Sequence, residues 1–414
     1  MSHGGVGRSA RLLSRNLVAY LAGRFCAGTA TMLLRAAILW HVFELSHSAF
    51  QLGLVGIVQF VPALGLMLVG GALADTHDRR RIMITAQWLW FAAAVALCGA
   101  VYAHRVSLPI LYGAVLLVAV AGAFDSPARA ALLPTLVPRE LLPRTVTIAT
   151  TNQALAFATG PALAGVLIAE AGIGAVYATY ALLVVGSIVA MWFLRPGAEE
   201  RSREPSRNAP SIAAIREGLG FVRRRQVVLG CMVLDMFAVI FGGAAALLPI
   251  YANDILHVGP RGYGLLSAAS EVGALLTSAT LTFLPTVRRA GVTLLVTVAM
   301  FGVATIIFGA SRSFPLSLAA YMLVGVADQV SVVMRSTAIQ LTTPDALRGR
   351  VSAVNLLFIG ASNQLGAAES GFLAALTSAP FAVVGGGVAC LVVVAVVTAT
   401  MPELRRYRTS AAPA

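Results

Sequence analysis

The fold of this chain is decided by the segment between its second and third long apolar stretches, which reads Gly70-Gly71-Ala72-Leu73-Ala74-Asp75-Thr76-His77-Asp78-Arg79-Arg80-Arg81. Small residues and a carboxylate end the second stretch, and three consecutive arginines open the third. About twelve apolar stretches follow one another between Asn16 and Met401, each close to the ~20 residues that a membrane-spanning helix needs. The pattern predicts an all-α integral membrane protein.

The composition supports lipid as the solvent of this chain. Of its 414 residues, 58% are hydrophobic and only 11% are charged, with a mean hydropathy of +0.84. A soluble helical protein of this size would carry polar faces on its helices, and stretches such as 111–123 and 381–400 have almost none. The cysteines stand singly in apolar stretches, which is typical of small core residues rather than of disulfides or metal ligands.

The apolar stretches predict twelve transmembrane helices in two groups of six. We expect the crossings at residues 17–43, 51–75, 80–103, 108–135, 145–170, 174–195, 227–252, 262–285, 289–311, 314–341, 349–376 and 379–400. The expected domains are an N-terminal six-helix half at 1–195, a cytoplasmic linker with a short amphipathic helix at 196–225, a C-terminal six-helix half at 226–402, and a cytoplasmic tail at 403–414.

The net charge of +13 reflects membrane topology rather than binding to nucleic acid. All 30 basic residues are arginines, and 23 of them lie in the two tails or in alternate loops. The other loops hold only three, Arg105, Arg261 and Arg312. This bias follows the rule that cytoplasmic loops are rich in positive charge. We therefore expect both termini and the linker in the cytoplasm, which requires an even number of crossings.

The second part of the linker has the pattern of an amphipathic helix. Apolar side chains recur at helical spacing, with arginines on the other side: Ile212, Ile215, Leu219 and Val222 against Arg216, Arg223, Arg224 and Arg225. A helix of this kind is typical of a segment that lies on the membrane face.

The two halves of the chain are related by a repeat. A shift of 206 residues superposes Arg129 on Arg335, Pro138 on Pro344, Leu141 on Leu347, Arg144 on Arg350, Gly160 on Gly366 and Gly165 on Gly371. Six identities at one offset indicate duplication. Two parallel six-helix repeats are the layout of one large transporter class, in which the binding site lies between the halves near the bilayer midplane.

The segment at 70–81 resembles the G-x-L-x-D-R-x-G-R-R signature of the major facilitator superfamily. Thr76 stands in place of the first Arg of that signature, and Asp78 in place of the Gly before the Arg pair. The segments 124–138, 348–351 and 361–371 resemble a branch that contains siderophore (enterobactin) exporters, transmembrane secretion effectors, and related macrolide and drug exporters. The resemblance spans nearly the whole chain and implies the major facilitator fold.

The resemblance also implies a gate at the cytoplasmic face. In the family, the carboxylate of this signature latches the second crossing against the start of the eleventh while the exterior is open. Asp125 and Arg129 are four residues apart on one helix face and can pair with each other. The residues to which we assign this gate are Gly71, Asp75, Arg79, Arg80, Asp125, Arg129, Arg348 and Arg350.

The fifth crossing contains Gly160-Pro161-Ala162-Leu163-Ala164-Gly165. Small residues let helices approach closely, and a proline bends the backbone. The segment resembles the antiporter motif G-P-x-x-G-G, with Ala164 in place of one glycine. The resemblance favours export by exchange, with Gly160, Pro161 and Gly165 as the motif residues.

Ionisable residues inside the membrane are costly to bury without a partner and therefore point to function. Burial favours the protonated form of a carboxylate, so that it can carry a proton. Our candidates for proton coupling are Glu271 and Asp328, followed by Asp235, although each of the three could equally be a paired, silent group. Position and polarity suggest that the cavity is lined by Arg35, His41, Gln59, Asn152, Gln153 and Asn355.

These observations predict a secondary active exporter in the cell membrane, driven by proton antiport. The expected cargo is a small molecule such as a siderophore or another natural product. A multidrug or macrolide efflux pump, a proton-coupled importer and a non-transporting membrane scaffold remain alternatives. The chain has no nucleotide-binding loop and no lysine to complete one. We expect no cofactor, no metal, no enzymatic activity and no nucleic acid. The expected partners are the substrate, protons and the lipid bilayer, with the protein a monomer.

Overall fold

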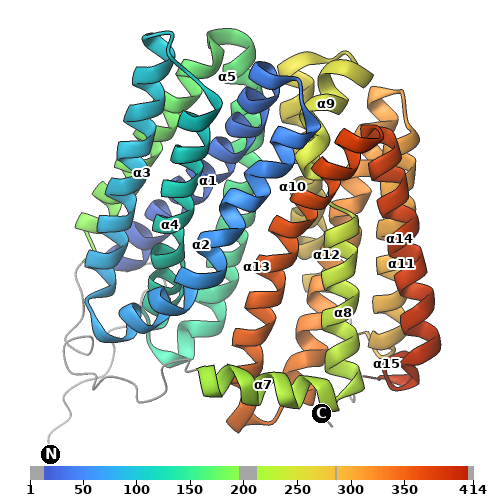
Figure 1. Cartoon of the computed structure of the whole chain (residues 1–414). Helices are drawn as coiled ribbons and strands as arrows, with labels where there is room; N and C mark the ends of the chain where they lie inside the picture. The colour runs from blue at the N-terminus through green and yellow to red at the C-terminus, as the bar shows by residue number, and fades with distance from the viewer. Residues whose placement is uncertain (1–13, 195–211, 285–286, 409–414) are drawn as a thin grey trace, which may run out of the picture.

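The computed structural model describes residues 14–194, 212–284 and 287–408, and this part of the chain consists of helices and connecting turns without a strand (Figure 1). The first group of helices comprises α1 (Arg15–Ser46), α2 (Ala49–Thr76), α3 (Arg79–Tyr102), α4 (Leu108–Leu132) and α5 (Leu142–Trp192). The second comprises α8 (Gln226–Phe241), α10 (Gly259–Phe283), α11 (Ala290–Ala310), α12 (Phe314–Thr342), α13 (Asp345–Leu376) and α14 (Ala379–Thr400).

Short elements complete the chain. The first group includes η1 (Leu133–Thr135) and η2 (Arg139–Leu141). Helix α7 (Ile212–Arg224) precedes the second group, and α15 (Pro402–Arg406) follows it. The path from α8 to α10 passes through η3 (Ala244–Leu247), α9 (Leu248–Ile250) and the π-helical turn η4 (Tyr251–Ile255). The expected crossing at 227–252 is therefore interrupted after Phe241.

Nine helical segments in the described ranges are long and apolar enough to cross a bilayer. One of them is α5, whose 51 residues would span about 76 Å, more than twice the thickness of a hydrocarbon core. Gly172 breaks α5 with φ 79° and ψ 172°, a conformation that suits glycine. The break lies between the fifth and sixth expected crossings. The membrane-protein fold class is confirmed, and the count of twelve crossings stays a prediction.

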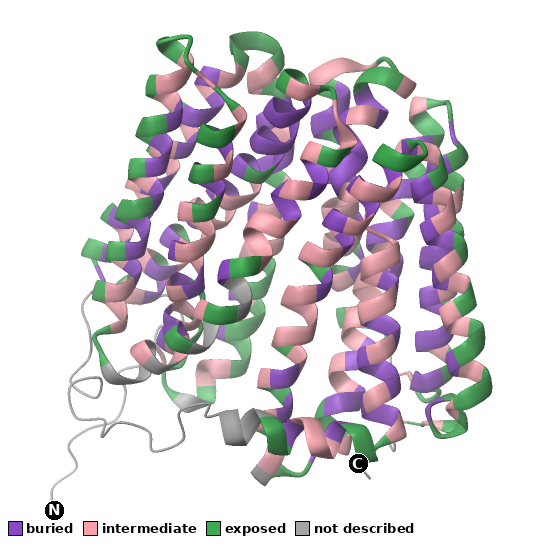
Figure 2. Ribbon diagram, in the orientation of Figure 1, coloured by how far each residue is buried: buried purple, intermediate pink, exposed green. Residues whose placement is uncertain are grey.

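Many exposed residues lie on the outer faces of the bundle (Figure 2), and the exposed residues include large apolar ones. Leu182 is 71% exposed, Val61 64% and Val296 60%. In water such a surface would be unfavourable, whereas in a bilayer it faces lipid tails. The distribution of apolar residues therefore fits a protein whose solvent is the membrane.

The two groups of helices meet closely at the end of the bundle away from the described chain ends. At this end Gly165 of α5 packs on Gly264 of α10, and Gly53 of α2 packs on Gly371 of α13. A Cβ on Gly165 would lie 2.5 Å from the Cα of Gly264, so only glycine fits. Gly165 and Gly371 are the two residues that the 206-residue repeat superposes. Toward the other end α2 and α13 diverge (Figure 1).

Each group of helices contains one buried ion pair. In the first group, the Arg129 guanidinium donates to both oxygens of Asp125, at 2.9 and 3.0 Å, within α4. The amide of Gln87 on α3 donates to the same carboxylate at 3.2 Å. In the second group, Arg335 of α12 pairs with Asp235 of α8. In both ion pairs, the attraction between the two charges offsets the free energy that each would cost if it were buried without a partner.

The amphipathic linker segment forms α7, which packs against α13 and α8. Ile212 and Ile215, two of its predicted apolar positions, have side chains outside the described residues. Val222 is 1% exposed, and a Cβ on Gly218 would lie 2.9 Å from the carbonyl oxygen of Arg350. An ion pair between Glu217 and Arg350 reinforces this contact. Helix α7 is therefore joined to the second group of helices.

We predict that a larger side chain at Gly165 separates the two groups of helices at the end where they meet. The rings of Phe50 and Phe372, 5.0 Å apart, mark closure of that end. In a background without native cysteines, we expect a Phe50→Cys, Phe372→Cys pair to cross-link readily. Adding Gly165→Val should lower the cross-linking yield about fivefold or more, because overpacking costs ~1–3 kcal/mol.

Gly99→Val serves as the control, because a Cβ at Gly99 of α3 would meet no atom within 4 Å. An equal loss of cross-linking in both variants would show that the contact between Gly165 and Gly264 does not hold this end closed.

The buried pair of Arg335 and Asp235 predicts a stability test. Asp235→Ala leaves a guanidinium that is 3% exposed without its carboxylate, which typically costs ~3–5 kcal/mol. We expect a marked fall in the thermal unfolding temperature of the purified protein in detergent. Asp235→Ala combined with Arg335→Met should recover most of the loss.

Asp345→Ala provides the matched control for this test, because the Asp345–Arg348 pair is exposed and such pairs contribute less than ~1 kcal/mol. If Asp235→Ala unfolds at the same temperature as Asp345→Ala, the buried pair does not contribute as argued.

Candidate functional site: a central cavity

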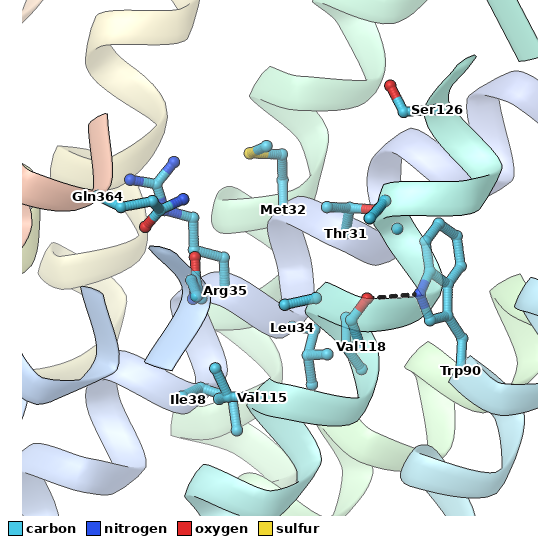
Figure 3. Close-up of a pocket in the computed structure, with 14 residues that line it drawn as sticks. Thr31, Met32, Leu34, Arg35, Ile38, Trp90, Val115, Val118, Ser126 and Gln364 are labelled. Carbon is cyan, nitrogen blue, oxygen red and sulfur yellow. Dashed lines mark hydrogen bonds between the residues drawn. The ribbon is translucent and has the colours of Figure 1, made fainter. Parts of the chain in front are cut away.

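A cavity of about 340 Å³ lies between the helices of the first group and reaches α13 of the second (Figure 3). Helix α1 supplies one wall, with Thr31, Met32, Leu34, Arg35 and Ile38. The remaining walls come from α2, α3, α4 and α13. They contribute Gln59, Trp90, Val115, Val118, Ala119, Gly122, Ala123, Ser126 and Gln364. The walls are mostly apolar, and Arg35 is the ionisable residue among them.

Two further cavities adjoin the central one. A cavity of about 360 Å³ shares Thr31, Trp90, Gly122 and Ser126 with it and extends toward Arg24. A small recess of about 70 Å³ on the opposite side shares Met32 and Arg35. Because they share lining residues, the three cavities adjoin one another along α1 and form a path from Arg24 to the side chain of Arg35.

The small recess brings together groups from both halves of the chain. Arg35 and Pro161 from the first group line it with Tyr263, Glu271 and Tyr321 from the second. Glu271 is close enough to Arg35, and to Asp328 on α12, to interact with both electrostatically. The hydroxyl of Tyr263 donates to the carbonyl of Ala36 at 2.9 Å and ties α10 to α1. Glu271 and Arg35 thus line the deep end of the path together, and Asp328 lies within electrostatic range of Glu271.

The antiporter-type motif of α5 lies behind this recess. A Cβ on Gly160 would lie 2.7 Å from the Cβ of Met32, so this glycine lets α5 approach α1. Pro161 forms part of the recess wall, and Gly165 makes the backbone contact with α10. The motif therefore packs α5 against the two helices that carry Arg35 and Glu271.

The arginines after α2 bind the carbonyl ends of neighbouring helices. Arg79 donates to the carbonyl of Ala131 at the end of α4, at 3.0 Å. Arg80 donates to the carbonyls of Met191 and Trp192 at the end of α5, each at 2.9 Å. A cation at a helix C-terminus is favourable because carbonyl groups are unpaired there. These two side chains tie the start of α3 to the ends of α4 and α5.

The other expected gate residues lie apart from this loop. The side chain of Asp75 falls outside the described residues, and Gly71 lies on the preceding turn of α2. Arg348 pairs with Asp345 at 2.7 Å on the exposed start of α13. Arg350 pairs with Glu217 of α7, which packs against the second group of helices. The contacts of both arginines are therefore separate from the first group.

The expected cavity residues divide into two sets. Arg35 and Gln59 line the central cavity, and Gln153 lines the adjoining one, where it contacts Arg24. His41 is 5% exposed and bonds the hydroxyl of Tyr177 at 2.8 Å. The amide of Asn152 donates to the carbonyl of Leu21 at 3.0 Å. His41 and Asn152 therefore join α1 to α5 instead of lining the cavity, and Asn355 lies partly exposed on α13.

Asp235, the third candidate for proton coupling, lies in the buried pair with Arg335 and is 7% exposed.

Trp90 and Gln364 are among the residues of the central cavity that were not expected from the sequence. Trp90 is an apolar residue whose indole N–H donates to the carbonyl of Val118 at 3.1 Å, and a tryptophan in an apolar stretch gives no signal of its own. Gln364 lies in the 361–371 segment that supported the family resemblance, and its polarity within a crossing was the available signal.

Comparison with known proteins agrees with this geometry. The family described as transmembrane secretion effector matches residues 18–412. The chain is 26% identical over 389 residues to the enterobactin exporter EntS of Escherichia coli O1:K1 / APEC, covering 93% of this chain and 91% of that protein. It is 27% identical over 397 residues to the enterobactin exporter EntS of Citrobacter koseri, with the same coverage.

Solved structures of transporters share the fold. A POT family transporter in complex with 5-aminolevulinic acid superposes with a TM-score of 0.72 at 12% identity, over 94% of this chain and 96% of that one. A POT family transporter in complex with a thioalcohol-conjugated peptide gives a TM-score of 0.73, with the same identity and coverage. The expected major facilitator fold is confirmed. The chain belongs to the transmembrane secretion effector family and is a multi-pass membrane transporter of small molecules, not an enzyme.

Proposed function

We propose that this protein is a secondary exporter that exchanges protons for its cargo. The observation that carries the proposal is the position of Glu271, within range of Asp328 and in the same recess as Arg35 and Pro161. Carboxylates that are shielded from water near a cation can bind and release a proton as their surroundings change. Glu271 and Asp328 carry the proton, and Asp235 serves as the structural partner of Arg335.

Transport proceeds by alternating access between two halves, residues 1–195 and 226–402. The charge bias of the loops supports a cytoplasmic location for both termini and the linker. In that orientation the glycine contacts lie at the outer face, and the present state faces the cytoplasm. Opening of the outer face then requires Gly165 to part from Gly264 and Gly53 from Gly371. A latch between Asp75 and the start of α13 would close the inner face in the alternate state.

The cargo is a secreted small molecule, with a siderophore as the leading class. Two relatives covered over most of their length are named enterobactin exporters, which supports export as the direction and a siderophore as the class. The packing role of the Gly160-Pro161 segment supports exchange as the mode of transport. We propose a monomer as the transporting unit.

The siderophore assignment predicts a change in the metabolites of a deletion strain. Deleting the gene should remove an iron-regulated chelator from the medium and raise its level inside the cells, because its exit route is lost. Mass spectrometry of medium and cells, with and without iron, measures both pools. Re-expression of the wild-type gene is the control. An unchanged metabolite profile would rule out the siderophore and leave susceptibility to dyes and antibiotics to decide for a drug exporter.

If Glu271 and Asp328 carry the proton, replacing either one should stop active transport but not cargo exchange. Glu271→Gln and Asp328→Asn should each abolish uphill accumulation in inverted vesicles under a proton gradient, since an amide cannot carry the proton. Cargo exchange without a gradient should persist, because alternating access itself remains. Glu403→Gln, an exposed carboxylate beside the C-terminal tail, is the control. Uphill transport at wild-type rates in both variants would contradict the assignment, and flux in the opposite direction would indicate an importer.

A further inference from the structure

Helix α1 carries two arginines on one face, and both line the cavity path. Arg24 and Arg35 are 11 residues apart, which is close to three full turns and about 16 Å along the helix axis. Gly28 and Thr31 lie between them on the same stripe and line the same cavities. The sequence of α1 therefore presents two guanidinium groups in a row toward the space between the helices.

The Arg35 side chain is accessible although its neighbours are buried. The residue is exposed, whereas Leu34 and Ala36 are each only 4% exposed. Its accessibility comes from the cavity, because Arg35 lines both the central cavity and the recess. Its guanidinium makes no hydrogen bond or ion pair with any residue in the described ranges. Glu271 is near enough to act on it through charge alone.

Three other arginines in the apolar stretches of the described helices have partners. Arg129 is paired with Asp125, and Arg335 with Asp235. Arg24 contacts the hydroxyl of Tyr20 and the amide of Gln153. A charged group within a membrane is costly unless something compensates it. Arg35 has the charge of Glu271 nearby but no hydrogen-bond partner in the described ranges, which leaves its N–H groups to water or a ligand.

We propose that Arg35 is the receptor for an anionic group of the cargo, so that the cavity selects organic anions with an apolar, aromatic-sized body. This inference rests on the proposed exporter function and specifies its substrate class. Figure 3 shows Arg35 and Gln364 together at one side of the pocket and Trp90 at the other. A carboxylate held by the guanidinium can accept a second bond from the amide of Gln364, while Trp90 and Val115 contact the body.

The charges along the path favour the same class of ligand. Three guanidiniums and one carboxylate line the two larger cavities, from Arg24, Arg35, Arg129 and Asp125. Two of their buried N–H groups, on Arg24 Nε and Arg129 Nη1, have no hydrogen-bond partner among the described residues. The net positive charge of Arg24, Arg129 and Asp125 in the adjoining cavity attracts an anion and repels an organic cation on the way to Arg35.

The binding test uses three probes of nearly the same shape and different charge. They are 2-naphthoate, 2-naphthamide and 2-naphthylmethylammonium, titrated by calorimetry against the purified full-length protein in lipid nanodiscs, with empty nanodiscs as the blank. We expect 2-naphthoate to bind about tenfold to a hundredfold more tightly than the amide, the range for hydrogen bonds to a charged group. The ammonium probe should bind most weakly.

Arg35→Gln should remove the preference for 2-naphthoate over 2-naphthamide, and retained binding of 2-naphthamide shows that the variant is folded. Arg35→Lys should keep part of the preference, because lysine keeps the positive charge but cannot form the two parallel hydrogen bonds that a guanidinium makes with a carboxylate. Arg105→Gln, in the exposed loop between α3 and α4, is the matched control and should behave as wild type. Equal affinities of the naphthoate and the amide for the wild type, or a preference that survives Arg35→Gln, would overturn the proposal.

The outcome is separable from the fate of the exporter proposal. If the anion preference is absent while proton-driven export of a neutral or cationic cargo is observed, the substrate class is wrong and the exporter stands. If Arg35 confers the preference while Glu271→Gln and Asp328→Asn transport uphill at wild-type rates, proton coupling fails and the anion site stands.

Discussion

An ionised side chain inside hydrocarbon must be compensated, and this constraint organises the centre of the molecule. Asp125 with Arg129 meet it by pairing within α4, and Asp235 with Arg335 by pairing between α8 and α12. Arg35 differs from Arg129 and Arg335, because its guanidinium makes no hydrogen bond or ion pair in the described ranges and lines the central cavity.

The two halves of the repeat share a buried or nearly buried arginine but differ in the carboxylate that pairs with it. Arg129 and Arg335 occupy equivalent positions in the two halves, and their side chains are only 11% and 4% exposed. Their carboxylates come from different places, the same helix α4 in the first half and the separate helix α8 in the second. Duplication thus preserved the buried cation, while the position of its anion diverged. A pair within one helix stiffens that helix, and a pair between helices fixes their spacing.

Local signals made much of the fold predictable. Apolar length predicted the bounds of helices such as α3, α11 and α14 to within a few residues, and spacing by four identified the pair of Asp125 and Arg129 before any contact was known. The interruption after Phe241 was not predictable, because the residues that follow it remain apolar. The long-range pair of Asp235 and Arg335 was missed because nothing in the sequence links two residues 100 positions apart. His41 and Asn152 were misleading because polarity alone does not distinguish a residue that joins two helices from one that faces a cavity.

The glycine contacts have a consequence for how the transporter moves. Where Gly165 meets Gly264, backbone touches backbone, and no side chain lies between the helices. Parting such surfaces requires no rotamer to change and no interdigitated side chains to withdraw. Under the proposed alternating access, this contact therefore adds no side-chain rearrangement of its own to the opening of the outer face, and the side chains that must move there are those beside it, such as Phe50 and Phe372.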